Sequence, residues 1–404
     1  MTVKERFLNY VKFDTTSDEN SPSCPSTVGQ TVLLSALYKE LLSMGVDASM
    51  DENGYVTAKI PANVEKAPKI CFIAHVDTSP AVSGKDVNPV CITYDGGDVT
   101  LKSGVVIEEK DNPDLKKYLG KELIVTDGTT LLGADDKAGV AEIMTAVETL
   151  VLNPKIKHGD VLIAFTPDEE IGRGTDKFNV KDFGADFGYT IDGGALGEIE
   201  YENFNAASLS LTINGVSIHP GSAKNVMKNA VDLFCEFHSL LPETMRPNST
   251  CGYEGFYMAD EVSGGIESLT CKYIIRNHDF QKFTKMKDYV LETIKFLNLK
   301  HGENTFECVI KDSYYNMAEI IKENFHLIEN AKKAMNIAGI EPIIIPIRGG
   351  TDGARLSFEG LPCPNLSTGG YNFHGKREFI PSFALEKMVE VILNLIDVYS
   401  KVVA

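Results

Sequence analysis

Acidic and imidazole side chains follow three apolar segments of the sequence and precede an amphipathic one. They are His75 and Asp77 after residues 70–74, Asp168, Glu169 and Glu170 after residues 161–165, Asp192 after residues 189–191, and Asp135 and Asp136 before a helical pattern that begins near Lys137. Ligand sites of open α/β sheets lie at the carboxyl ends of strands, so these groups are expected to converge in space. Imidazole and carboxylate are ligands that zinc prefers, at about 2.0–2.2 Å. The pattern therefore predicts metal chemistry.

The pair Asp135 and Asp136 has a simpler interpretation when it is taken alone. The helix that follows has one apolar face, formed by Val140, Ile143, Met144, Val147, Leu150 and Val151. An Asp in the first turn usually caps a helix, because the free backbone N–H groups there favour negative charge. A metal site is favoured because acidic and imidazole side chains also follow the three apolar segments.

A site for two metal ions accounts for the number of candidate ligands. Two zinc ions about 3.5–4 Å apart can share a carboxylate and a water molecule, with about two further ligands for each ion. The candidate ligands are His75, Asp135, Glu170, Asp192 and His374. Asp77 lies two residues after His75, on the same face of a strand, and can orient the imidazole ring. A single histidine at a strand end would otherwise be an ordinary buried residue.

The neighbours Glu169 and Glu170 suggest a division of roles. In a regular strand they would point in opposite directions, so they must lie on a turn to serve one site. One carboxylate then binds metal, and the other accepts a proton from the metal-bound water and carries it to the leaving amine. The chemistry is hydrolysis. An isolated Glu-Glu pair would more simply belong to a solvated loop.

Composition restricts the class of protein. The chain has 404 residues, 43% of them hydrophobic and 24% charged, which is typical of a globular protein with two domains. A net charge of −18 argues against a nucleic-acid surface; it suits cationic substrates or metals, and equally it keeps a protein soluble. The eight cysteines form no Cys-x-x-Cys pair. Because no apolar segment is long enough for a bilayer span or a signal core, we expect a cytoplasmic protein without membrane contact.

The order of the expected elements predicts an α/β fold with an inserted domain. Residues 1–205 alternate strand and helix patterns, which indicates a doubly wound, mostly parallel sheet, with loops and short edge strands between residues 79 and 119. Residues 206–312 follow a β-α-β-β-α-β order, typical of a small antiparallel sheet with helices on one face. Residues 313–404 resume the α/β pattern and complete the catalytic domain that residues 1–205 begin. Within these parts we expect helices over residues 225–241 and 313–338 and a strand over residues 343–347.

Several short sequences resemble the tripeptide aminopeptidases of the di-zinc peptidase family, which also includes peptidase V, glutamate carboxypeptidase and succinyl-diaminopimelate desuccinylase. The resemblance runs over essentially the whole chain and is carried by residues 75–79, 133–139, 166–170, 192–194 and 371–375, and further by residues 202–208, 253–257 and 348–353.

The resemblance implies a role for each ligand. His75, Asp135 and Asp192 would hold one zinc ion, and Asp135, Glu170 and His374 would hold the other, with Asp135 as the bridge. It also implies that Glu169 is the general base, that Asp77 supports His75, and that the peptide bond between Asp135 and Asp136 is cis.

The inserted domain would serve as a lid, and it contains the first candidate for a substrate contact, His219. Similar enzymes use a histidine like His219 to polarise the scissile carbonyl, although an ordinary surface turn would explain it too. Arg276 and Arg348 are candidates for the peptide carboxylate, since a guanidinium group binds it bidentately, but either could form a structural ion pair. Asn203 is a further candidate.

The function expected from these residues is removal of the N-terminal residue of tripeptides with a free N-terminus, using a metal-bridging water and two zinc or other divalent ions. A dipeptidase or N-deacylase would use the same ligands, and a non-catalytic peptide-binding relative is the alternative of another class. A nucleotide site is excluded, because no Gly-x-x-x-x-Gly-Lys-Ser/Thr loop occurs. A homodimer is possible.

Overall fold

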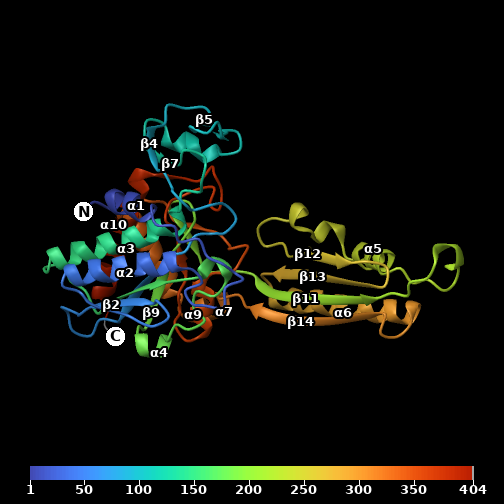
Figure 1. The fold of residues 1–404 in the computed structure, drawn as a ribbon. Helices are drawn as coiled ribbons and strands as arrows, with labels where there is room; N and C mark the ends of the chain where they lie inside the picture. Colours follow the sequence, from blue (N-terminus) through green and yellow to red (C-terminus); the bar gives the residue numbers. More distant parts are fainter. Residues whose placement is uncertain (403–404) are drawn as a thin grey trace. The chain divides into compact units, whose positions relative to one another are not determined.

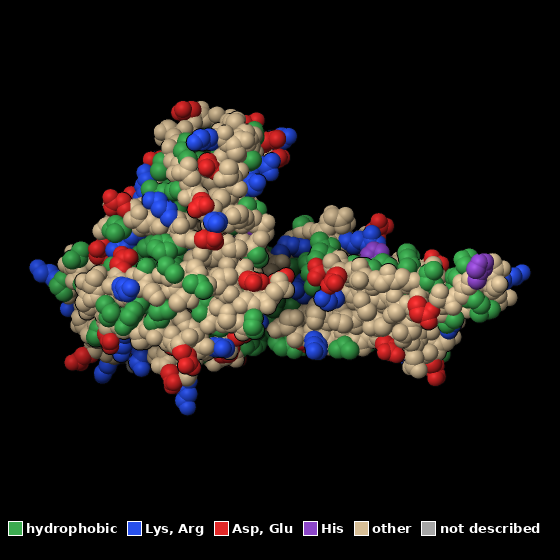
Figure 2. Space-filling view, viewed as in Figure 1, with side chains coloured by type: hydrophobic (Ala, Val, Ile, Leu, Met, Phe, Trp, Pro, Cys, Tyr) green, Lys and Arg blue, Asp and Glu red, His purple; other side chains and the backbone are tan. Residues whose placement is uncertain are grey.

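The computed structural model describes residues 1–402, which divide into two units (Figure 1). Unit 1 contains residues 1–201, 319–345 and 351–402, and unit 2 contains residues 202–318 and 346–350. Within the described residues, none of the helices combines the length and the apolar character that a bilayer crossing requires. Acidic and basic side chains are interspersed over the visible face of each unit (Figure 2).

Unit 1 is built on a mixed, mostly parallel sheet of eight strands. In spatial order these are β1 (Asp47–Met50), β2 (Val56–Ile60), β8 (Val161–Thr166), β3 (Ile70–His75), β9 (Phe187–Ile191), β16 (Asn365–Leu366), β10 (Glu198–Glu200) and β15 (Ile343–Ile344). Strands β8, β3, β9 and β16 are mutually parallel, whereas β1, β2 and β10 pair antiparallel with their neighbours β2, β8 and β16. Every residue of β3 and β8 is buried, as their continuous apolar sequences predict. The α/β fold class is confirmed.

Different helices cover the two faces of this sheet. Phe72 of β3 stacks on Tyr189 of β9, whose hydroxyl lies 3.0 Å from that of Tyr399. Cys71, which points to the opposite face, packs in a cluster with Leu356. The helices of unit 1 include α1 (Val3–Tyr10), α2 (Val28–Ser43), α3 (Ala134–Leu152), α9 (Asp352–Phe358) and α10 (Ser382–Ser400). Tyr399 belongs to α10 and Leu356 to α9, so the sheet is doubly wound.

A small lobe of unit 1 forms where we expected loops and edge strands. Its sheet joins β4 (Val90–Thr93), β7 (Glu122–Val125) and β17 (Phe379–Pro381), beside the hairpin of β5 (Val99–Thr100) and β6 (Val106–Ile107) and the 3-10 helix η1 (Pro113–Tyr118). These strands do not join the eight-stranded sheet, and they enclose a hydrophobic cluster of their own. The short edge strands expected between residues 79 and 119 are present, since β4 lies at the edge of its sheet and β5 and β6 have two residues each. The separate sheet was not predicted, because β7 pairs with β17, more than 250 residues away in the sequence.

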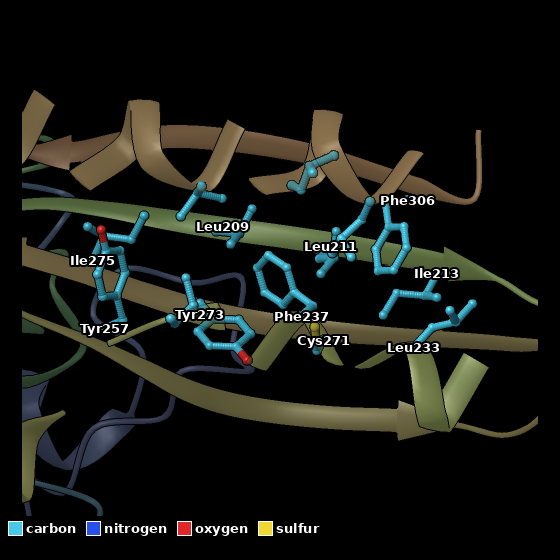
Figure 3. Packing of buried hydrophobic residues seen from close by; sticks show 14 of the residues in the cluster. Leu209, Leu211, Ile213, Leu233, Phe237, Tyr257, Cys271, Tyr273, Ile275 and Phe306 are labelled. Carbon is cyan, nitrogen blue, oxygen red and sulfur yellow. The ribbon is translucent and has the colours of Figure 1, made fainter. Parts of the chain in front are cut away.

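Unit 2 has the predicted β-α-β-β-α-β order. The elements are β11 (Asn205–Asn214), α5 (Ala230–Leu240), β12 (Phe256–Gly264), β13 (Ser268–Asn277), α6 (Phe280–His301) and β14 (Phe306–Tyr314), and the antiparallel sheet has the spatial order β12-β13-β11-β14. Leu209, Leu211 and Ile213 alternate with exposed or half-buried residues along β11 and point into the core with Phe237 and Tyr273 (Figure 3). The alternating pattern therefore identified the buried face correctly.

Three element boundaries differ from the expected ones. Helix α5 starts at Ala230 rather than near residue 225, because the Asn229 side chain accepts a hydrogen bond from the Val231 N–H at 3.1 Å and caps it. The helix expected up to residue 338 is two helices, α7 (Ala318–Glu323) and α8 (His326–Ile337). The strand expected over residues 343–347 is the two-residue β15.

Candidate metal centre

The predicted convergence of strand ends takes place within unit 1. His75 ends β3, Glu169 and Glu170 follow β8, and Asp192 follows β9. These three strands are parallel neighbours, so their carboxyl ends meet at one edge of the sheet. Asp135 comes to the same place from the start of α3.

One group of candidate ligands surrounds His75. Its Nε2 lies 3.0 Å from Asp135 Oδ1 and 3.5 Å from Asp192 Oδ1. The other ring nitrogen, Nδ1, lies 3.1 Å from the Asp77 carbonyl oxygen and 3.3 Å from Asp77 Oδ1. Asp77 thus turns the ring so that Nε2 faces the two carboxylates, as the spacing in the sequence predicts.

A second group surrounds His374. Its Nε2 lies 3.0 Å from Asp135 Oδ2 and 2.9 Å from Glu170 Oε2. Asp135 therefore presents one carboxylate oxygen to His374 and the other to His75. In each group the ligand atoms lie within 4.8 Å of one another.

The two adjacent aspartates do different things. The peptide bond between Asp135 and Asp136 is cis, which confirms that prediction. Both residues have non-helical backbone angles, so the regular part of α3 begins at Lys137. Asp136 is buried and accepts a hydrogen bond from the His75 backbone N–H at 3.1 Å. The carboxylate of Asp135 is therefore left to the two imidazole rings.

Glu169 and Glu170 lie on the turn that the sequence requires, the 3-10 helix η2 (Glu169–Ile171). The Asp77 carboxylate accepts hydrogen bonds from both of their backbone N–H groups, at 3.0 and 3.1 Å. Glu169 lines a small cavity together with His75 and Asp192. The turn thus presents Glu170 to His374 and Glu169 to the first group.

The pKa values of the buried carboxylates and of His374 are shifted from their ordinary values. Burial raises the pKa of Glu169 well above its ordinary value and that of Glu170 to about 7. Burial also opposes ionisation of Asp135, but hydrogen bonds with His374 and His75 hold its pKa below the usual range. Hydrogen bonds to Asp135 and Glu170 raise the pKa of His374 to about 10. Positive charge beside these carboxylates, on protonated histidines or on bound cations, therefore favours their charged forms.

The donor set fits divalent cations. Glu170 Oε1 is buried and has no hydrogen-bond partner within residues 1–402. Two imidazole nitrogens and three carboxylates converge, and this mixture of nitrogen and oxygen donors suits zinc and related divalent ions.

Reasoning from the sequence missed a buried carboxylate beside this site. Glu378, in the segment before β17, accepts hydrogen bonds from the backbone N–H groups of residues 132–135. Asp352 was missed too; it lines the same cavity as Glu169 and accepts a hydrogen bond from the Thr166 hydroxyl at 3.1 Å. Neither has a local sequence signal, because their partners are distant in the chain.

The four candidate substrate residues all belong to unit 2. His219 is exposed, and its Nδ1 accepts a hydrogen bond from the Gly221 N–H at 3.1 Å. The amide of Asn203 is buried; it donates to the carbonyl oxygens of Phe204 and Tyr315 and accepts from the Met317 N–H. All three hydrogen bonds of the Asn203 side-chain amide join it to backbone groups of unit 2, so this amide has a structural role.

The two arginines differ in how fully they are engaged. Arg348 donates to the carbonyl oxygens of Gly252 and Glu254 and to the Thr250 hydroxyl, at 2.7 to 3.0 Å, and stacks on Phe204. Arg276 uses Nη1 alone, which donates to two carbonyl oxygens of neighbouring strands. The hydrogen-bond acceptors of both arginines are carbonyl or hydroxyl oxygens rather than carboxylates. Arg276 thus retains more of its donors for a ligand.

Comparison with known proteins finds relatives over the full length. Peptidase T of Caldanaerobacter subterraneus subsp. tengcongensis is 56% identical over 404 residues, covering 99% of each chain. Peptidase T of Clostridium novyi is 55% identical over 404 residues with the same coverage. The family model of the peptidase dimerisation domain matches residues 201–301, which lie almost entirely in unit 2.

Solved structures share the fold. Aminopeptidase PepT from Bacillus cereus has a TM-score of 0.79 and 22% identity, over 99% of this chain and 98% of its own. A tripeptidase from Staphylococcus aureus has a TM-score of 0.79 and 21% identity with the same coverage. A dinuclear metal-binding peptidase of the M20 family from Bacillus subtilis has a TM-score of 0.65 and 14% identity, over 98% of this chain and 97% of its own.

Proposed function

The chain belongs to the peptidase T family, and we propose that it is a zinc-dependent aminopeptidase that releases the N-terminal residue of tripeptides. The observation that carries the proposal is the meeting of two histidines and three carboxylates in two groups that share Asp135. Family membership supports the substrate class, because the metal ligands alone do not distinguish an aminopeptidase from a dipeptidase or an N-deacylase.

We assign one ion to His75, Asp135 and Asp192 and the other to Asp135, Glu170 and His374. When bound, the ions would polarise the scissile carbonyl and lower the pKa of the attacking water. Glu169 takes a proton from that water and passes it to the leaving amine nitrogen. The hydrogen bonds of Asp77 to the turn keep Glu169 in place for this transfer.

A digest of matched peptides tests the substrate class. The panel compares dipeptides, tripeptides and tetrapeptides, each with a free and an acetylated N-terminus, on zinc-loaded protein. We expect release of the first residue from free tripeptides and little cleavage of the acetylated ones. Comparable cleavage of the acetylated peptides would favour a deacylase, preference for dipeptides would favour a dipeptidase, and no cleavage at all would favour a peptide-binding relative.

His219 is assigned to the oxyanion of the scissile carbonyl, with unit 2 as a substrate-binding lid. A hydrogen-bond donor of this kind is worth about 10²–10³ in turnover. A His219→Ala variant is expected to lose that much in kcat while it keeps its metal ions, because His219 is not among the ligands. Nearly normal turnover in this variant would remove His219 from the catalytic residues.

Arg276 is the arginine that we propose for the peptide carboxylate, since its Nε and Nη2 make no recorded hydrogen bond among residues 1–402. Charge-assisted hydrogen bonds contribute about 1.5–3 kcal/mol, so Arg276→Ala should lower kcat/KM for tripeptides about 10- to 100-fold. C-terminally amidated tripeptides should lose much less. Arg348→Ala is the matched control: it should lower the melting temperature, because Arg348 holds residues 250–254 in place. An equal loss for acids and amides in Arg276→Ala would contradict the assignment.

A homodimer through unit 2 is also proposed. Its support is the match to the peptidase dimerisation domain and a sheet whose edge strands β12 and β14 each have a single partner in the described chain. Light scattering of the purified protein would distinguish a dimer from a monomer.

A further inference from the structure

A single buried carboxylate, that of Glu378, gathers four consecutive backbone N–H groups. Its Oε2 accepts from Leu132 at 2.7 Å and from Gly133 at 2.9 Å. Its Oε1 accepts from Ala134 at 2.7 Å and from Asp135 at 3.3 Å. Only 1% of Glu378 is exposed. Successive N–H groups that point to one side form an anion-binding concavity, and here the anion is a side chain of the same unit.

The shape of the 132–135 segment depends on this carboxylate. Gly133 has a positive φ of 83°, which lets the chain turn so that neighbouring N–H groups share a side. Asp135 has a non-helical φ of −90° and ψ of 103°, so α3 itself does not fix its direction. Without an acceptor these buried N–H groups would be left unsatisfied, and the segment would favour another conformation.

Glu378 also belongs to the short loop that carries His374. The loop is closed by two backbone hydrogen bonds between Tyr371 and Phe379, at 2.9 and 3.1 Å. Arg377 donates from Nε to the Val106 carbonyl oxygen at 2.7 Å and ties the loop to the small lobe. One loop thus supplies an imidazole to the second group of ligands and a carboxylate to the segment that carries the bridging aspartate.

We propose that Glu378 is a positioning residue that holds Asp135 in register with His374. The two ligands lie 239 residues apart in the sequence, yet their side-chain atoms are 3.0 Å apart. The Glu378 carboxylate is the direct link between their backbone segments. The inference rests on the proposed metal site, and it assigns Glu378 an effect on metal affinity without contact with an ion.

Two substitutions separate this role from a general contribution to stability. In Glu378→Gln one oxygen remains as an acceptor, but the amide NH2 faces backbone N–H donors. In Glu378→Asp both oxygens remain, on a side chain that is one CH2 shorter, and partial rescue is expected. The matched control is Asp51→Ala, because Asp51 Oδ1 also accepts two backbone N–H groups, from Asn53 and Tyr55 at 2.9 Å, in the turn between β1 and β2.

The test is a Co²⁺ titration of the metal-free protein, followed by visible absorption and by metal analysis. Losing a hydrogen-bond partner of a metal ligand typically costs 10- to 100-fold in metal affinity or activity. The more weakly bound of the two Co²⁺ ions should therefore bind to Glu378→Gln about 10- to 100-fold less tightly than to the wild type. The affinity of Glu378→Asp should lie between those of Glu378→Gln and the wild type. With zinc restored, kcat for tripeptides should fall by a similar factor with little change in KM. Asp51→Ala should lose thermal stability alone.

Two outcomes would overturn the proposal. One is a Glu378→Gln protein with a lowered melting temperature but both Co²⁺ affinities within twofold of wild type. The other is a Glu378→Gln protein that does not fold, together with a folded Glu378→Asp protein that has wild-type affinities. Because the titration does not use substrate, a wild-type protein inactive on tripeptides would refute the proposed function and leave this result intact.

Discussion

A Glu169→Gln variant is expected to lose about 10²–10⁴ in kcat for tripeptides while it retains both metal ions. Glutamine has nearly the same shape, and the backbone N–H of residue 169 would still donate to Asp77. Its amide, however, cannot take a proton from the attacking water. Steady-state kinetics and metal analysis on the same preparation would measure both effects.

The adjacent residue provides the control for this experiment. Glu170 lies on the same turn, but its Oε2 is 2.9 Å from His374 Nε2, in the second group of ligands. Glu170→Gln should therefore lose metal as well as turnover. If Glu169→Gln kept wild-type kcat, or if both variants lost the same amount of metal, the division of roles between Glu169 and Glu170 would be wrong.

The candidate ligands at the strand ends could be predicted from the sequence because each follows an apolar segment. His75 and Asp192 lie at the ends of continuous apolar segments. These segments form neighbouring parallel strands, which bring the two ends together. The separation of Glu169 from Glu170 followed from strand geometry, which requires a turn for both to serve one site. Local pattern and sheet topology were therefore sufficient to place the first group.

Glu378 could not be predicted in the same way. An acidic residue before a short strand has many ordinary roles, and its four N–H partners lie 243 to 246 residues away. The small lobe was missed for the same reason, since β7 pairs with β17 from the far end of the chain. Contacts of this range leave no periodic signal in either segment.

The local chemistry of caps and strands determined how well unit 2 could be predicted. The alternation of apolar and polar residues along β11 identified its buried face, because the other face of this strand is exposed to solvent. The start of α5 was misjudged by five residues because apolar periodicity was given more weight than Asn229, whose side chain caps the helix. Asn203 was a further candidate for substrate binding, whereas its amide is occupied by backbone groups of unit 2.

The other large effect is expected at the shared carboxylate. Asp135 turns one oxygen to His75 and one to His374, each at 3.0 Å. Asp135→Asn keeps a single oxygen and presents an NH2 group to one imidazole. Because a metal ion contributes several kcal/mol to the transition state, we expect kcat to fall by about 10³-fold or more, with weaker binding of both ions. Metal analysis after dialysis against a chelator, together with kinetics, would measure the loss.

The neighbouring Asp136 makes this prediction specific. Its Oδ2 accepts the His75 backbone N–H at 3.1 Å, so Asp136→Asn retains the acceptor that its position needs. We expect Asp136→Asn to bind two ions and to keep most of its turnover. Loss of one ion alone in Asp135→Asn would show that Asp135 serves a single site. Equal losses in both variants would mean that the conformation of the 135–136 segment, rather than the shared carboxylate, limits metal binding.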